Sequence, residues 1–370
     1  MVLWILNSLM AFLLCVFCAG ILIPQILLIA FRKRLFDIPD ERKIHHVVVP
    51  RLGGFAFKPV IVFSLALLLG INLLLGHREM LSSIVDNIQT LSFGYCAILL
   101  LYLTGMADDL VGIRYKAKFI VQMFCAILLI AGGIWVGDLH GLLGIHEIPT
   151  YISWPLTLIL IIFIINAVNL IDGIDGLASG LSCIACLTYG VCFFAFGHYL
   201  YAMMSFATLG VLVPFFYYNV FGNPDKQKKI FMGDTGSLTI GLILCVLSIK
   251  MVSGYTEAIW SVNPLIIAFT PLLVPGCDVV RVFLRRVRNG KNPFLPDQTH
   301  IHHKLLALGI SQHISILIIF SMSISLILLN ILLSRWVNVN IVLVGDVMIW
   351  TLGNIWLTRR IGKYKQRDNH

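Results

Sequence analysis

The stretch LTLILIIFIINAVNLIDGIDGLASGLSCIACLTYGVCFFAF, residues 156–196, places a polar loop between two long apolar runs. An α-helix needs about 20 apolar residues to cross the roughly 30 Å hydrocarbon core of a membrane, and each run approaches that length. Because backbone polar groups in hydrocarbon must be satisfied within their own segment, both runs are predicted to be helices. The loop between them nevertheless carries Asn166, Asn169, Asp172 and Asp175. The stretch therefore predicts a membrane protein with a chemically distinct loop at one end of two helices.

The rest of the chain repeats this apolar pattern. Of its 370 residues, 59% are hydrophobic and 12% are charged, whereas a soluble domain has about 25% charged residues. We predict an all-α integral membrane protein, a single polytopic domain over residues 1–370. The expected transmembrane helices, about eleven in number, lie near residues 3–31, 53–75, 88–106, 118–137, 154–171, 176–197, 199–218, 237–252, 263–284, 313–334 and 339–358.

The basic residues predict how the chain is oriented. With these eleven helices, 24 of the 27 lysines and arginines fall on one side of the membrane, and only Arg78, Lys250 and Arg335 fall on the other. Positively charged segments stay in the cytoplasm. We therefore expect a periplasmic N-terminus, a cytoplasmic C-terminus and a multi-pass location in the inner membrane. The net charge of +9 is explained by this asymmetry, and no nucleic-acid partner is expected.

Polar residues gather in the segments predicted to face the cytoplasm. The outer segments have no comparable concentration. We therefore expect the active-site loops on the cytoplasmic face, at residues 32–54, 105–118, 166–180, 218–237 and 285–306.

Five aspartates stand at similar depth at inner helix ends: Asp108, Asp109, Asp172, Asp175 and Asp234. Carboxylates near a membrane are costly and mark functional sites. Like charges so close together would repel unless a cation lay among them. Oxygen ligands of this kind suit Mg²⁺ or, as an alternative, Mn²⁺. A single aspartate at a helix end is more often a helix cap, and that interpretation stays open for Asp109 and Asp175.

The last polar segment differs because it is rich in histidine. It contains Asp297, His300, His302 and His303. A histidine cluster can bind a transition metal. Recognition of phosphate and sugar by imidazole donors, helped by nearby arginines, is at least as well supported. The residues alone leave both interpretations open.

Five motifs, spread over roughly residues 32–306, resemble one known family. They are DIPDERKIHHVVVPRLGG (37–54), GMADDLVGIRYKAK (105–118), NAVNLIDGIDGL (166–177), FMGDTGS (231–237) and NPFLPDQTHIHH (292–303). Their order and spacing resemble the polyprenyl-phosphate N-acetylhexosamine-1-phosphate transferases, the MraY/WecA-like superfamily. The final motif is similar to the WecA-type undecaprenyl-phosphate GlcNAc-1-phosphate transferases.

This resemblance implies a Mg²⁺-dependent glycosyl-1-phosphate transferase. The phosphate of undecaprenyl phosphate would attack the β-phosphorus of a UDP-N-acetylhexosamine and release UMP. The resemblance implies that Asp234 binds the metal. It implies that Asp108 and Asp109 hold the metal or accept a proton, and that Lys116 is the basic residue following the aspartate pair.

The resemblance also implies roles in substrate binding. Asn169, Asp172, Asp175 and Asn219 would shape the nucleotide pocket. The diphosphate or the lipid phosphate would be bound by Arg42, Lys43, His45 and Arg51, and the sugar phosphate by Asp297, His300, His302 and His303.

The sugar is expected to be N-acetylglucosamine, donated to initiate a cell-surface polysaccharide. Alternatives are a phospho-MurNAc-pentapeptide transferase or an enzyme for another UDP-N-acetylhexosamine such as a deoxy-amino sugar. A cation-coupled transporter is a more distant alternative, since transporters gather polar groups near the bilayer midplane. The lipid chain length, the polymer pathway and the oligomeric state, with a homodimer among the choices, stay open.

Overall fold

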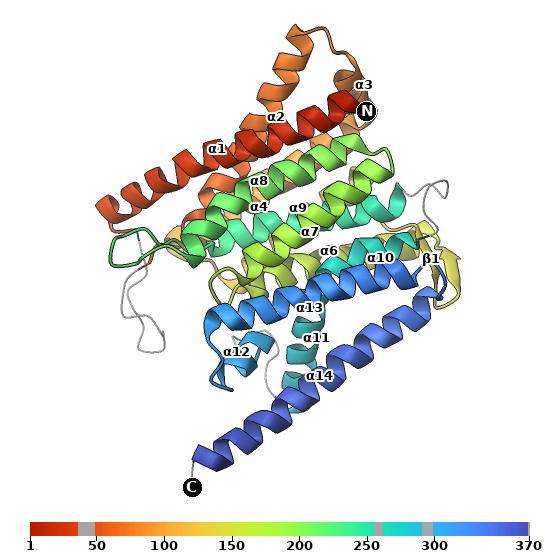
Figure 1. The fold of residues 1–370 in the computed structure, drawn as a ribbon. Helices are drawn as coiled ribbons and strands as arrows, with labels where there is room; N and C mark the ends of the chain where they lie inside the picture. The colour runs from red at the N-terminus through yellow and green to blue at the C-terminus, as the bar shows by residue number, and fades with distance from the viewer. Residues whose placement is uncertain (36–48, 255–261, 291–298, 369–370) are drawn as a thin grey trace.

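A computed structural model describes residues 1–35, 49–254, 262–290 and 299–368. Its helices lie in a layered array with α1 along one edge and α14 along the other (Figure 1). The elements are α1 (Val2–Lys33), η1 (Gly53–Ala56), α2 (Phe57–Leu74), α3 (Glu79–Asp86), α4 (Ile88–Val111), α5 (Tyr115–Ala131), β1 (Asp138–Leu142), β2 (Ile145–Glu147), α6 (Thr150–Ile171), α7 (Leu177–Ala195), α8 (Tyr199–Val220), α9 (Gly233–Ser253), α10 (Pro264–Phe269), η2 (Thr270–Leu272), α11 (Leu273–Arg288), α12 (Ile301–Leu306), α13 (Gln312–Leu333) and α14 (Val339–Asp368).

Ten spans in the described part of the chain are long and apolar enough to cross a membrane. α5 has 17 residues and runs antiparallel beside α4. The Gln89 side chain donates a hydrogen bond to the Ala131 carbonyl at 2.8 Å, and Lys118 donates to Asp108 at 3.1 Å. These bonds join the two helices at both of their ends. α5 therefore lies along α4 and corresponds to the helix predicted over 118–137, while the ten spans correspond to the other ten predicted helices.

α9 forms the centre of the molecule. In its most apolar stretch, 94% of the residues are buried, and α9 packs against α4, α6, α7 and α10. Its sequence, GDTGSLTIGLILCVLSIKMVS, is apolar or small on every face, as expected of a helix surrounded by protein. Because α9 begins at Gly233, this packing puts Asp234 in the middle of one face of the molecule.

The helix predicted over 263–284 is broken into two helices. α10 ends at Phe269, a short 3₁₀ turn follows, and α11 begins at Leu273. Pro271 and Pro275 lie at the break, and proline lacks the backbone N–H that a continuous helix needs. After the break, α11 runs across the direction of the other helices towards α12 and α14 (Figure 1). The apolar composition of this run did not predict the change of direction.

The segment after α5 forms a hairpin that was predicted only as an outer loop. β1 and β2 pair antiparallel, and the Asn340 side chain at the start of α14 donates to the Gly141 carbonyl at 2.9 Å. The ends of α5 and α9 lie nearby, since Lys250 donates to the Gly133 carbonyl at 3.3 Å. The hairpin therefore lies at the end of the helix array opposite Asp108 and Asp234.

Candidate active site

Two of the predicted aspartates meet at one lysine. Lys118, in the first turn of α5, contacts Asp108 at 3.1 Å and Asp234 at 2.6 Å. Asp108 is near the end of α4, and its other oxygen accepts a hydrogen bond from the Ile113 amide at 2.7 Å. All three side chains are partly exposed. The ends of three helices thus bring two carboxylates and one ammonium to a surface that a ligand can reach.

Asn169 fixes the second oxygen of Asp234. Its side-chain amide, near the end of α6, donates to Asp234 at 2.7 Å and lies 2.7 Å from the Ser237 hydroxyl. With Lys118 on one oxygen and Asn169 on the other, the orientation of the Asp234 carboxylate is fully determined. Asn169, predicted from the sequence to shape the nucleotide pocket, thus contacts the predicted metal ligand directly.

Asp109 holds the beginning of α9. Its carboxylate accepts hydrogen bonds from the Asp234 amide at 2.8 Å, the Thr235 amide at 2.9 Å and the Thr235 hydroxyl at 2.6 Å. The first amides of a helix have no partner within the helix, so Asp109 caps α9 from a neighbouring element. Gly105 permits this, because a Cβ there would collide with the backbone of Thr235.

Residues 50–54 lie against the start of α9 through the backbone. The Phe231 amide donates to the Pro50 carbonyl, and the amides of Gly53 and Gly54 donate to the carbonyls of Phe231 and Met232, each at 2.9 Å. This pairing brings the predicted first and fourth inner loops together and places Arg51 beside the carboxylates.

The loop that opened the sequence analysis is tied to two other segments. Asp175 is buried and forms an ion pair with Lys229 at 2.5 Å. Asn219, near the end of α8, accepts a hydrogen bond from the Gly176 amide at 2.6 Å and donates to the Ile230 carbonyl at 2.8 Å. Lys229 thus neutralises the buried carboxylate of Asp175.

Asp172 is the aspartate of this loop whose protonation is most affected. It is half-buried. Burial and the negative charges of Asp175 and Asp234 raise the pKa of its carboxyl to about 7, while the charge of Arg51 opposes the shift. The Asp172 carboxyl therefore lies within electrostatic reach of Asp175, Asp234 and Arg51.

The histidine segment reaches the same loop. The His302 ring is completely buried, and a side chain at Gly173 would collide with it. His302 stacks on His300, with ring centroids 5.8 Å apart, and contacts His303 at 4.2 Å. Burial, with the charges of His303 and His300, lowers the pKa of His302 to about 3. Neither of its ring nitrogens has a hydrogen-bond partner within the described part of the chain.

Sequence reasoning missed Asp278, which anchors this histidine segment from α11. Asp278 is completely buried, and one of its oxygens lies 2.8 Å from Nδ1 of His300. A carboxylate within an apolar run is a signal that could have identified it. Asp278 lies inside the predicted helix 263–284 rather than in one of the polar segments.

Not every predicted residue lies at this site. Lys116 is exposed on α5, and Lys118, two residues later, contacts the carboxylates instead. The role of Lys116 in substrate binding stays a prediction. Arg42, Lys43, His45 and Asp297 lie outside the described residues, so their predicted roles are not placed by the structure.

The carboxylates of the site suit a divalent cation that takes only some of its ligands from the protein. Among the described residues, no three His, Cys, Asp or Glu side chains converge as a complete metal cage. Asp109 uses both oxygens on α9, which leaves the Asp108–Asp234 pair, already bridged by a cation in Lys118. Mg²⁺ is commonly held by one or two carboxylates together with substrate phosphates and water. The pair therefore fits Mg²⁺ in the presence of a phosphate ligand.

A sequence profile described as Glycosyl transferase family 4 matches residues 91–252. The match runs from α4 to the end of α9 and so contains Asp108, Asp109, Asn169, Asp172 and Asp234.

Similarity to characterised proteins extends beyond this region. A Bacillus subtilis protein named as a probable undecaprenyl-phosphate N-acetylglucosaminyl 1-phosphate transferase is 30% identical over 313 residues, which cover 84% of this chain and 80% of the relative. An undecaprenyl-phosphate alpha-N-acetylglucosaminyl 1-phosphate transferase of Salmonella typhi is 30% identical, over 77% of this chain and 72% of the relative. The protein of that name from Yersinia pestis is 27% identical, over 92% and 90%.

Proposed function

The chain belongs to the superfamily of polyprenyl-phosphate N-acetylhexosamine-1-phosphate transferases, and from this premise we propose that it transfers N-acetylglucosamine 1-phosphate from UDP-GlcNAc to undecaprenyl phosphate. The observation that carries the proposal is the Asp108–Lys118–Asp234 cluster, which joins three helix ends at one reachable surface. The names of the relatives support the substrates.

The reaction exchanges one phosphoanhydride bond for another. An oxygen of the lipid phosphate forms a bond to the β-phosphorus of UDP-GlcNAc, and the bond from that phosphorus to the bridging oxygen breaks. UMP leaves with the bridging oxygen, and undecaprenyl-diphospho-GlcNAc is formed. A phosphate is largely ionised at neutral pH, so positioning of the two substrates contributes more than removal of a proton.

We propose Mg²⁺ as the cofactor, with Mn²⁺ as an alternative, held by Asp108 and Asp234. When bound, the ion would neutralise negative charge on the diphosphate and on the departing UMP oxygen. The chain's own residues prepare this place. Asn169 fixes the Asp234 carboxylate, and Lys118 supplies a positive charge to both carboxylates. We assign Asp109 to holding α9 rather than to binding the metal.

The remaining residues divide between the two ends of the nucleotide-sugar. Asp172, Asp175 and Asn219 shape the loop at 172–176 that would border the nucleotide, and Arg51 lies beside it to meet phosphate. The histidines at 300–303 contact this loop at Gly173, so they can reach the sugar phosphate while the nucleotide lies against the loop.

The membrane setting follows from the same proposal. The multi-pass chain would lie in the inner membrane with this cluster facing the cytoplasm, where UDP-sugars are made. The basic residues support this orientation, because positively charged segments remain cytoplasmic. Assembly as a homodimer stays a prediction.

The deciding experiment measures UMP release by purified protein with Mg²⁺ and undecaprenyl phosphate. UDP-GlcNAc, UDP-GalNAc, a UDP-deoxy-amino sugar and UDP-MurNAc-pentapeptide are compared at equal concentration. We expect turnover to be fastest with UDP-GlcNAc and absent without the lipid phosphate. Turnover of the pentapeptide substrate alone would transfer the protein to peptidoglycan precursor synthesis, and no UMP release from any donor would reject the proposed reaction.

A further inference from the structure

Asp278 organises the start of the histidine segment through several hydrogen bonds. One oxygen accepts from Arg281 at 2.7 Å and from the Ile301 amide at 3.1 Å. The other lies 2.8 Å from His300 Nδ1 and accepts a longer hydrogen bond, at 3.3 Å, from the same Ile301 amide. Arg281 also donates to the Thr299 carbonyl at 2.6 Å. A buried carboxylate without a counter-charge would be costly, and Arg281 supplies that charge. Asp278 is therefore ionised and acts only as an acceptor.

An ionised acceptor determines which nitrogen of His300 carries a proton. A carboxylate can only accept a hydrogen bond, so Nδ1 of His300 must be the donor. Nε2 is then the ring nitrogen that can meet a ligand. With its proton on Nδ1, the ring leaves Nε2 with a lone pair, so Nε2 accepts a hydrogen bond from that ligand.

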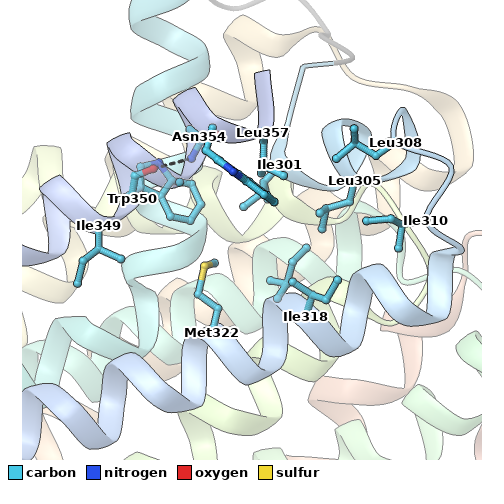
Figure 2. A pocket seen from close by; sticks show the side chains of 13 residues that line it. Ile301, Leu305, Leu308, Ile310, Ile318, Met322, Ile349, Trp350, Asn354 and Leu357 are labelled. Atoms are coloured by element: carbon cyan, nitrogen blue, oxygen red, sulfur yellow. Dashed lines mark hydrogen bonds between the residues drawn. The ribbon is translucent and has the colours of Figure 1, made fainter. Parts of the chain in front are cut away.

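α12 is fixed on its other sides as well. The Lys304 ammonium donates to the side chains of Asn354 at 3.0 Å and Thr358 at 3.1 Å on α14. Ile301 and Leu305 line an apolar cavity of about 350 Å³ between α12, α13 and α14, across from Trp350 (Figure 2). With His302 against Gly173, α12 is held by α11, α14 and the 172–176 loop. The His300 ring is therefore presented from a rigid support.

We propose that Asp278 is a positioning residue for the transfer reaction, acting through His300 to present Nε2 as a hydrogen-bond acceptor to a hydroxyl of the nucleotide-sugar. The inference rests on the proposed function for the identity of that ligand. It goes beyond that function because Asp278 lies behind the histidine segment and acts only through His300.

Asp278→Asn isolates this role with little change in shape. The asparagine oxygen can keep the contacts with Arg281 and the Ile301 amide, since both meet the same carboxylate oxygen. The amide nitrogen then faces His300 and donates to Nδ1, which must become an acceptor. The substitution therefore moves the ring proton to Nε2, which can then no longer accept a hydrogen bond, while the contact with the Ile301 amide remains.

The test is a double-mutant cycle with Asp278→Asn, His300→Ala and the double variant. We expect each single variant to lower kcat/KM for UDP-GlcNAc by about 10- to 100-fold, the usual effect of removing a group that orients a ligand-binding histidine. The kcat/KM of the double variant should lie within about threefold of that of the less active single variant, because both changes remove the same function. Asp346→Asn is the matched control, because Asp346 is also buried beside the helix break but hydrogen-bonds Asn330 instead.

Two outcomes would overturn the inference: losses that multiply in the double variant, or Asp278→Asn with the kcat/KM of the native protein. The tautomer is measured without turnover, from imidazole ¹⁵N chemical shifts assigned by comparison with His300→Ala. The His300 signal should show a protonated Nδ1 in the native protein and an unprotonated Nδ1 in Asp278→Asn. If the native protein releases no UMP from any donor, the proposed function fails, and unchanged ¹⁵N shifts would separately reject Asp278 as the group that sets the tautomer.

Discussion

At the scale of single residues, Lys118 shows what a sequence pattern leaves undecided. The motif GMADDLVGIRYKAK offers Lys116 and Lys118, two residues apart. Successive helical residues are rotated by about 100°, so these two side chains point in nearly opposite directions on α5. Which one meets the carboxylates depends on where α5 begins and how it packs on α4. The acidic residues could be predicted because each is a charged residue at the end of an apolar helix, whereas the lysine partner could not.

Asp234→Asn is expected to remove most of the activity. The variant loses the charge that Lys118 and Asn169 orient, and with it the proposed metal ligand. Loss of a metal that neutralises leaving-group charge should cost several kcal/mol of transition-state stabilisation, or ~10³-fold in rate. UMP release with titrated Mg²⁺ checks this. Asp138→Asn, in the hairpin at the opposite end, should be nearly silent, and near-native turnover by Asp234→Asn in EDTA would contradict the metal mechanism.

The stability of the metal-free protein should vary with pH because of Asp172. Its pKa is raised to about 7 from an ordinary value of 3.8, so the folded protein favours the protonated form. The stabilisation that this preference gives the folded protein is fully present below about pH 4 and is lost as the pH rises through about 7. Thermal unfolding in EDTA should therefore show stability falling over this range, and Asp172→Asn should flatten that fall. Parallel curves for the two proteins would exclude Asp172 as the group responsible.

At the scale of helices, the start of α9 depends on a residue from another helix. Asp109 on α4 accepts both of the first amides and a hydroxyl. A sequence pattern identifies caps only when they lie next to the helix that they cap, so this one was visible only as an alternative for a lone aspartate. The break before α11 was unpredictable for a related reason. Pro271 and Pro275 are evident in the sequence, but their effect on direction depends on the helices that surround α10.

Asp109→Ala should weaken the attachment of α9 to α4. Loss of a cap costs about 0.5–2 kcal/mol, and leaving buried amides unpaired adds about 1–3 kcal/mol. We expect a lower thermal unfolding temperature in detergent. We also expect at least a tenfold loss of activity, because Asp109 holds the Asp234 amide and its removal would let Asp234 shift. Asp225→Ala, in an exposed loop, is the control. A stable but inactive Asp109→Ala would instead indicate that Asp109 contacts substrate or metal.

At the scale of the whole molecule, most of the architecture was predictable because lipid restricts the choice of structure. Spans such as 154–171 and 199–218 match α6 and α8 closely, since only helices can satisfy their backbones in hydrocarbon. The approach of the five inner segments to one another was predictable, because all five were predicted on the same side of the membrane. Their contacts were not, because residue pairs such as Asp175 with Lys229 and Gly173 with His302 depend on how loops fold back between helices.

The orientation of the chain gives a prediction about both ends. The distribution of basic residues predicts an N-terminus outside and a C-terminus inside. Reporter fusions at residue 370 and within residues 137–153 should therefore give opposite signals, cytoplasmic for the first and periplasmic for the second. The same signal at both positions would show that the predicted number of helices is wrong, because the seven spans predicted between them must place them on opposite sides.

The two halves of the site are separated in the order of synthesis. Asp108, Lys118, Asn169 and Asp234 are all present once α9 has been made, whereas His300 and its support from α11 and α14 come from the last quarter of the chain. Chains fold from the N-terminus as they leave the ribosome. A nascent chain can therefore assemble the carboxylate cluster around α9 before any histidine arrives. We therefore expect an unfinished protein in the membrane to leave nucleotide-sugar unconsumed, because the proposed site is completed only after the final helices have inserted.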